Sequence, residues 1–112
     1  MKVKTSAISL LLLQVSMGLS SVVQGQELGN AQAGLALAEQ TCSPCHAIRT
    51  GELRSPNARS PTFFELATAP GMTSIALTVA LTTPHAGMPM FMLTAEQRQD
   101  IIAYILNLKG RN

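Results

Sequence analysis

The stretch "CSPCH" at residues 42–46 holds both cysteines of the chain and, directly after them, one of its two histidines. Two thiols three residues apart lie about one helical turn from each other, and the next residue adds an imidazole, a common metal ligand. A disulfide between them would close a very short loop and constrain little. No other cysteine is left to crosslink the fold, so this stretch indicates a functional site rather than a stabilising disulfide.

The N-terminal sequence has the pattern of an export signal. Lys2 and Lys4 precede an apolar stretch centred on residues 10–13, and small residues follow. This order predicts a secretory signal peptide over residues 1–25, with residues 26–112 as the mature domain. Serine and glutamine interrupt the apolar stretch, which is shorter than the roughly 18 residues of a spanning helix. An uncleaved N-terminal anchor is the alternative.

The charge of the mature domain excludes one class of partner. The chain has eight Lys and Arg and six Asp and Glu, and removal of Lys2 and Lys4 with the signal peptide leaves the two signs balanced. A neutral domain without a run of basic residues has no electrostatic footprint for nucleic acid. We therefore predict no nucleic-acid partner.

Both ends of the mature domain predict helices. Residues 30–41 carry a narrow stripe of small apolar side chains at i, i+3, i+4 and i+7, which permits close approach by another helix. A second helix is predicted to begin at Thr94, with Gln97 completing a capping box, and to stop near Gly110. The two stripes are Ala31, Gly34, Leu35 and Ala38, and Ile101, Tyr104, Ile105 and Leu108.

The middle of the chain predicts two shorter helices and loops. One helix is expected to begin near Pro61 and run through Leu66, and another from Thr73 to before Pro84. Pro and Gly then predict an extended loop over residues 84–93. No segment has the alternating pattern of a strand, so the predicted fold class is all-α.

The "CSPCH" spacing is typical of c-type haem attachment. Thiols one turn apart can each add to a different vinyl group of one porphyrin, and His46 then meets the iron. Cys42 and Cys45 are thus predicted as covalent anchors of one haem c. The macrocycle would also complete the core of a small domain that has no Trp, one Tyr and three Phe.

Two other readings of the motif stay open at this point. A thioredoxin-like thiol oxidoreductase also uses Cys-x-x-Cys, but in a βαβ context. A structural zinc site needs four ligands, for which Cys42, Cys45, His46 and His85 are the candidates.

Four stretches together resemble the small monohaem class I cytochromes c of bacterial periplasms: "GLALAEQTCSPCHAI", "SPNARSPTFFEL", "TTPHAGMPMFMLT" and "DIIAYILNL". The resemblance covers nearly all of the mature domain. It implies the class I cytochrome c fold, with the first and last helices crossing and a Gly packed against an aromatic residue. Gly34 and Tyr104 are the matching positions.

The sixth iron ligand decides between an electron carrier and an open haem site. Met88 is the predicted ligand, because Gly87 and Pro89 hold its loop and the "GMP" setting is similar to the family's ligand loop. Met90, His85 and Met72 are the alternatives. Met90 and Met92 alternate with Met88, and we expect them to pack against the porphyrin.

Two further features bear on the haem. Arg49, Arg54 and Arg59 are candidates to pair with its propionates or with an acidic partner. A backbone carbonyl should orient the ring of His46, and Pro56 and Pro61 are the candidates.

The function implied by the resemblance is electron transfer in the periplasm through a haem c with His46 and Met88 as metal ligands. The protein is then a carrier and not an enzyme, with redox proteins as partners and no small-molecule substrate. Three alternatives remain: the cytochrome subunit of a periplasmic dehydrogenase or oxidase, a haem enzyme or ligand-binding protein with an exchangeable sixth position, and a haem-free thiol oxidoreductase.

Overall fold

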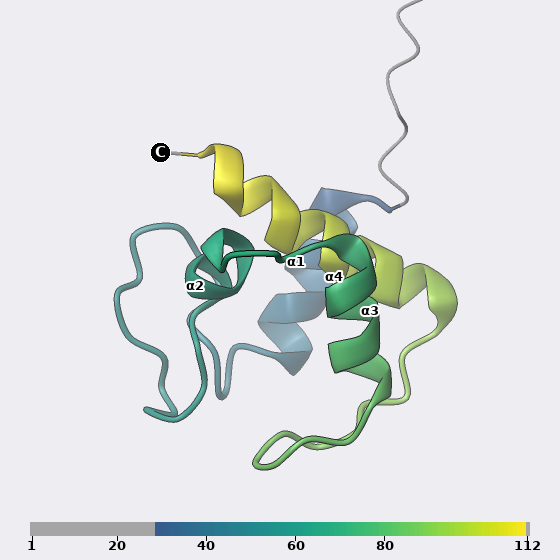
Figure 1. Cartoon of the computed structure of the whole chain (residues 1–112), viewed down its shortest axis with the longest axis horizontal. Coiled ribbons are helices and arrows are strands. Elements are labelled where there is room, and N and C mark those ends of the chain that lie inside the picture. Colours follow the sequence, from purple (N-terminus) through teal and green to yellow (C-terminus); the bar gives the residue numbers. More distant parts are fainter. Residues whose placement is uncertain (1–28, 112) are drawn as a thin grey trace, which may run out of the picture.

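A computed structural model describes residues 29–111 (Figure 1), so the predicted signal peptide at residues 1–25 lies outside the described part. The described residues form helices and loops, with no strand, which confirms the all-α prediction. None of these helices is long and apolar enough to cross a membrane. The elements are α1 (Ala31–Thr41), α2 (Phe63–Thr68), α3 (Ser74–Thr82), α4 (Ala95–Asn107) and the 3₁₀ helix η1 (Leu108–Gly110).

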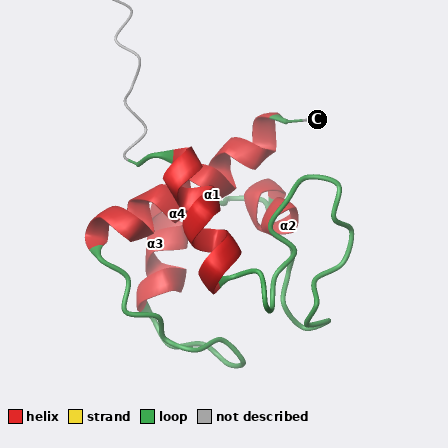
Figure 2. Ribbon diagram, turned by 180° about the vertical axis from the view of Figure 1, so that it is seen from behind, coloured by secondary structure: helices red, strands yellow, loops and turns green. Residues whose placement is uncertain are grey.

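Helices α1 and α4, from the two ends of the domain, cross in the centre of the molecule (Figures 1 and 2). The crossing is close because Gly34 of α1 is buried against α4. A Cβ atom at position 34 would collide with the backbone carbonyl of Asp100 and lie 2.9 Å from the Cβ of Tyr104. The predicted contact of Gly34 with Tyr104 is confirmed.

Each α-helix begins at a side chain that accepts hydrogen bonds from the otherwise unpaired N–H groups of the first turn. The capping box predicted for Thr94 and Gln97 is present, and Thr62 and Glu65 form another. Helix α2 therefore begins just after Pro61, as expected. The capping residues are Asn30, Thr62, Thr73 and Thr94.

Tyr104 joins α4 to the segment that follows the "CSPCH" stretch. Its side chain is 6% exposed, its ring lies 6.3 Å from that of Phe63, and its hydroxyl donates a 2.7 Å hydrogen bond to the carbonyl of Ile48. Burial raises the pKa of Tyr104 above its ordinary value of 10.0. The hydrogen bond requires the neutral phenol, so both effects disfavour the phenolate.

Replacing Tyr104 with phenylalanine is expected to lower the free energy of unfolding by about 1–3 kcal/mol, because the buried carbonyl of Ile48 loses its donor. The pH dependence should also change. A folded-state pKa above the unfolded value adds stability that is present below about pH 10 and is lost as pH rises further. Urea unfolding at neutral and alkaline pH should therefore show a steeper alkaline loss for wild type than for Tyr104→Phe. Equal slopes would contradict this role.

Candidate functional site

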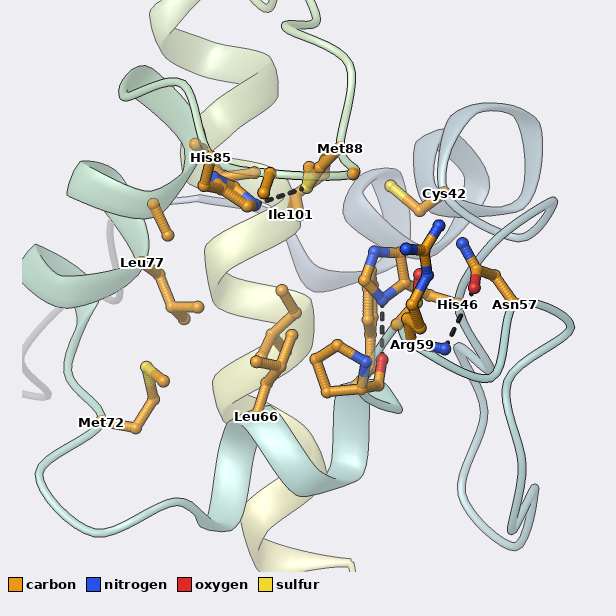
Figure 3. Close-up of a pocket in the computed structure, with 18 residues that line it drawn as sticks. Cys42, His46, Asn57, Arg59, Leu66, Met72, Leu77, His85, Met88 and Ile101 are labelled. Carbon is orange, nitrogen blue, oxygen red and sulfur yellow. Dashed lines mark hydrogen bonds between the residues drawn. The ribbon is translucent and has the colours of Figure 1, made fainter.

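The described part of the chain surrounds an apolar cavity of about 490 Å³ that is open on one side. Its walls come from the end of α1, from α2, α3 and α4, and from the loops that follow the "CSPCH" stretch and α3 (Figure 3). Segments distant in sequence thus meet around one space in the core. The apolar side chains lining it include Phe63, Leu66, Met72, Leu77, Leu81, Ile101 and Ile105.

The "CSPCH" stretch forms a turn at the end of α1. The N–H groups of Cys45 and His46 both donate to the carbonyl of Cys42, at 3.1 and 2.9 Å. Cys42 is buried on the cavity wall, whereas Cys45 is partly exposed and is not among the lining residues. Burial raises the pKa of the Cys42 thiol to about 11, so this thiol is neutral at physiological pH and suits an apolar wall.

The ring of His46 lies on the same wall in a fixed orientation. Its Nδ1 is 2.7 Å from the carbonyl oxygen of Pro61 (Figure 3), and its ring centroid is 5.6 Å from that of Phe63. A carbonyl only accepts, so Nδ1 carries the hydrogen and Nε2 keeps the lone pair that binds metals. Of the two prolines considered from sequence, Pro61 and not Pro56 orients the ring.

The loop between α3 and α4 brings His85 and Met88 to the cavity (Figure 3). It was expected to be extended, but residues 85–88 form a tight turn in which the N–H of Met88 donates to the carbonyl of His85 at 3.3 Å. Gly87 has φ +83°, a conformation that favours glycine. The His85 Nε2 lies 3.1 Å from the Met88 sulfur.

The other candidate methionines differ in whether they line the cavity. Met72, before α3, lines the cavity. Met90 and Met92 are 48% and 95% exposed and are not among the residues that line the cavity, so the structure does not support the expectation that they pack against the porphyrin with Met88.

One of the three arginines lies at the cavity. Arg59 is a lining residue, and its N–H donates to the Asn57 side chain at 3.0 Å. Arg49 instead forms an ion pair with Glu39, and Arg54 borders a separate hollow. Sequence reasoning missed Asn57, whose only signal was its place before Arg59 in a turn-rich loop.

The structure disfavours the two other readings of the motif. Within residues 29–111, no three His, Cys, Asp or Glu side chains are grouped as a metal site would require, so the zinc candidates do not come together. The same residues form no strand, so the βαβ context of a thiol oxidoreductase is missing from them.

The residues present fit a haem. A buried thiol and a ring nitrogen with a free lone pair border a large apolar cavity. The thioether of Met88 lines the same cavity, and so does one arginine. These are the kinds of side chain that could anchor a c-type haem, ligate its iron and pair with a propionate.

Comparison with known proteins agrees with this fit. Residues 29–105 match the family described as cytochrome C oxidase, cbb3-type, subunit III. A cytochrome c-552 from Bradyrhizobium diazoefficiens is 35% identical over 80 residues, which cover 71% of this chain and 76% of that protein. No solved structure matches the chain. The chain thus belongs to this cytochrome c family, as a small monohaem c-type cytochrome that carries covalent haem c and transfers electrons rather than catalysing a reaction.

Proposed function

We propose that this protein is a periplasmic carrier of single electrons, exported by a signal peptide at residues 1–25 and active as the domain of residues 26–112. Cys42 and Cys45 anchor the haem through thioethers, and His46 and Met88 are the axial ligands. One observation carries this proposal: the imidazole of His46 and the thioether of Met88 line the same apolar cavity as the buried Cys42.

A haem held by these residues would supply the redox change, through the ferric and ferrous states of its iron. The chain sets the reduction potential of the iron. The Pro61 carbonyl orients His46 and makes it a stronger donor, whereas Met88 offers a neutral sulfur, a ligand that raises the reduction potential. The apolar walls exclude water, which disfavours the form with the larger net charge.

Arg59 is proposed to hold a haem propionate. It is the arginine at the cavity, and its backbone is fixed by Asn57. A guanidinium binds carboxylates through paired, charge-assisted hydrogen bonds. Arg49 is already paired with Glu39, so it is not required for this role.

The partners are redox proteins, and an uncharged part of the chain is a candidate surface for contact with them. Residues 66–95 contain no Asp, Glu, Lys or Arg, and Ile75 and Val79 of α3 are 75% and 54% exposed. This uncharged segment also supplies Met88. A partner of the carrier would meet such a surface through a small, transient contact.

A second candidate function is a cytochrome subunit within a larger oxidase. It is favoured by the description of the matching family, which names a subunit of an oxidase. Mild crosslinking of the periplasmic protein in its host, followed by purification, separates the two: a stoichiometric complex supports the subunit, and a mostly free protein supports the carrier.

Optical spectra of the purified protein test the axial ligands. The ferric wild type is expected to show the weak far-red band of sulfur-to-iron charge transfer, and the ferrous protein should not bind CO readily. Met88→Ala should lose the far-red band, because its sulfur is removed. Met90→Ala, a matched loss of an exposed methionine from the same loop, should keep it. A far-red band that survives in Met88→Ala would refute the assignment.

A further inference from the structure

The two histidines of this chain share one arrangement. Nδ1 of His46 is 2.7 Å from the carbonyl of Pro61, and Nδ1 of His85 is 3.1 Å from the carbonyl of Thr83. A carbonyl oxygen only accepts hydrogen bonds, so each contact is a hydrogen bond when the ring hydrogen is on Nδ1, and the lone pair is then on Nε2. Both rings line the cavity. The fold therefore gives each imidazole a partner for the tautomer that binds a metal through Nε2.

The second imidazole stands beside the proposed methionine ligand. Nε2 of His85 lies 3.1 Å from the sulfur of Met88 (Figure 3). With the ring hydrogen on Nε2 this contact is a hydrogen bond to sulfur, whereas the tautomer that donates from Nδ1 to the stronger acceptor, the Thr83 carbonyl, keeps a lone pair on Nε2. In that second tautomer Nε2 and the Met88 sulfur are two neighbouring lone-pair donors at the same cavity.

Burial ranks the two donors. Met88 is half-buried, whereas His85 is exposed at the edge of the cavity. The tight turn with Gly87 at φ +83° holds both side chains in one short loop at the cavity. The more buried thioether of Met88 is thus the better candidate for the resident ligand, and the imidazole of His85 is the second candidate.

We propose that His85 is a reserve sixth ligand, which binds the haem iron through Nε2 when the thioether of Met88 is lost or dissociates. This inference rests on the proposed function. In the exchange one iron–sulfur bond breaks and one iron–nitrogen bond forms, with no change in electrons or protons. Its consequence is that the iron stays six-coordinate, at a lower potential, because a methionine ligand raises the potential.

Four holoproteins test the proposal: wild type, His85→Ala, Met88→Ala and the double variant. Met88→Ala is expected to lose the far-red sulfur band yet remain low-spin by electron paramagnetic resonance, with a lower potential and slow CO binding. The double variant should be high-spin and bind CO at once. His85→Ala should keep the wild-type spectrum. Added imidazole should return the double variant to the low-spin state, which shows that its haem site is intact.

The outcomes distinguish a failure of the reserve-ligand proposal from a failure of the proposed axial ligand Met88. If Met88→Ala is as high-spin and as open to CO as the double variant, His85 is not a reserve ligand, while Met88 stands as the resident one. If the double variant stays low-spin, another side chain fills the position and the proposal is overturned. If the sulfur band survives in Met88→Ala, the proposed function fails in its ligand assignment, and the inference fails with it.

Discussion

A Gly34→Val variant is expected to lose the native fold. The added side chain would collide with the carbonyl of Asp100, a backbone group that cannot rotate away as a side chain does, so α1 and α4 would have to separate. Overpacking typically costs about 1–3 kcal/mol and occasionally more, and the rigid obstacle places this site at the upper end. Separating α1 from α4 also exposes the apolar surface that they bury against each other, so the total loss approaches the stability of a small domain, which lies at the low end of the about 5–15 kcal/mol of native proteins.

Urea unfolding followed by circular dichroism measures this effect. Gly110→Val is the matched control, because a Cβ there meets nothing within 4 Å and the backbone has no positive φ. The control should unfold at nearly the wild-type urea concentration, whereas Gly34→Val should be unfolded or nearly so in buffer. A Gly34→Val protein as stable as the control would show that α1 and α4 do not cross this closely.

Removing both thiols is expected to have an effect of comparable size. A Cys42→Ala and Cys45→Ala double variant has no covalent anchor for the haem, so acidified organic solvent should extract any haem that it retains. Each single variant keeps one thioether and should keep its haem under the same treatment. Extraction of haem from wild type to the same extent as from the double variant would contradict the anchoring roles.

The double variant should also lose helical structure. The cost of a closed void is about 24 cal/mol per Å³, so a cavity of 490 Å³ would cost about 12 kcal/mol, and water entering from its open side reduces this figure. The total is still similar to the whole stability of a small domain. Circular dichroism of the haem-free double variant should therefore show weak helix signals and no cooperative melting, in contrast to wild type.

The helices were predictable because their signals are local. Side-chain caps at Thr94 and its counterparts, the spacing of apolar residues and the prolines of the loops each act within a few residues. The crossing of α1 and α4 was predictable from Gly34, because a stripe of small side chains on a helix allows another helix to pack closely against it. The haem c cofactor was predictable from "CSPCH", whose spacing matches the chemistry of two thioethers and one axial ligand, while the roles of the individual residues stay a prediction.

Other parts of the site depend on contacts between distant segments, which local patterns do not contain. The choice of Pro61 over Pro56 as partner of His46 depends on where α2 begins. Arg59 lies at the cavity and Arg49 does not, because Arg49 forms an ion pair with Glu39 of α1. Met88 lines the cavity, whereas Met90 is 48% exposed and does not line it, although alternation along an extended chain predicted one shared face.

Mass spectrometry of the protein purified after export into a periplasm tests the central claim most directly. The denatured protein is expected to have the mass of the polypeptide from residue 26 plus one haem, with both cysteines resistant to alkylation because each sulfur is a thioether. A correctly exported polypeptide without added mass, with two thiols that react with an alkylating reagent, would contradict the account.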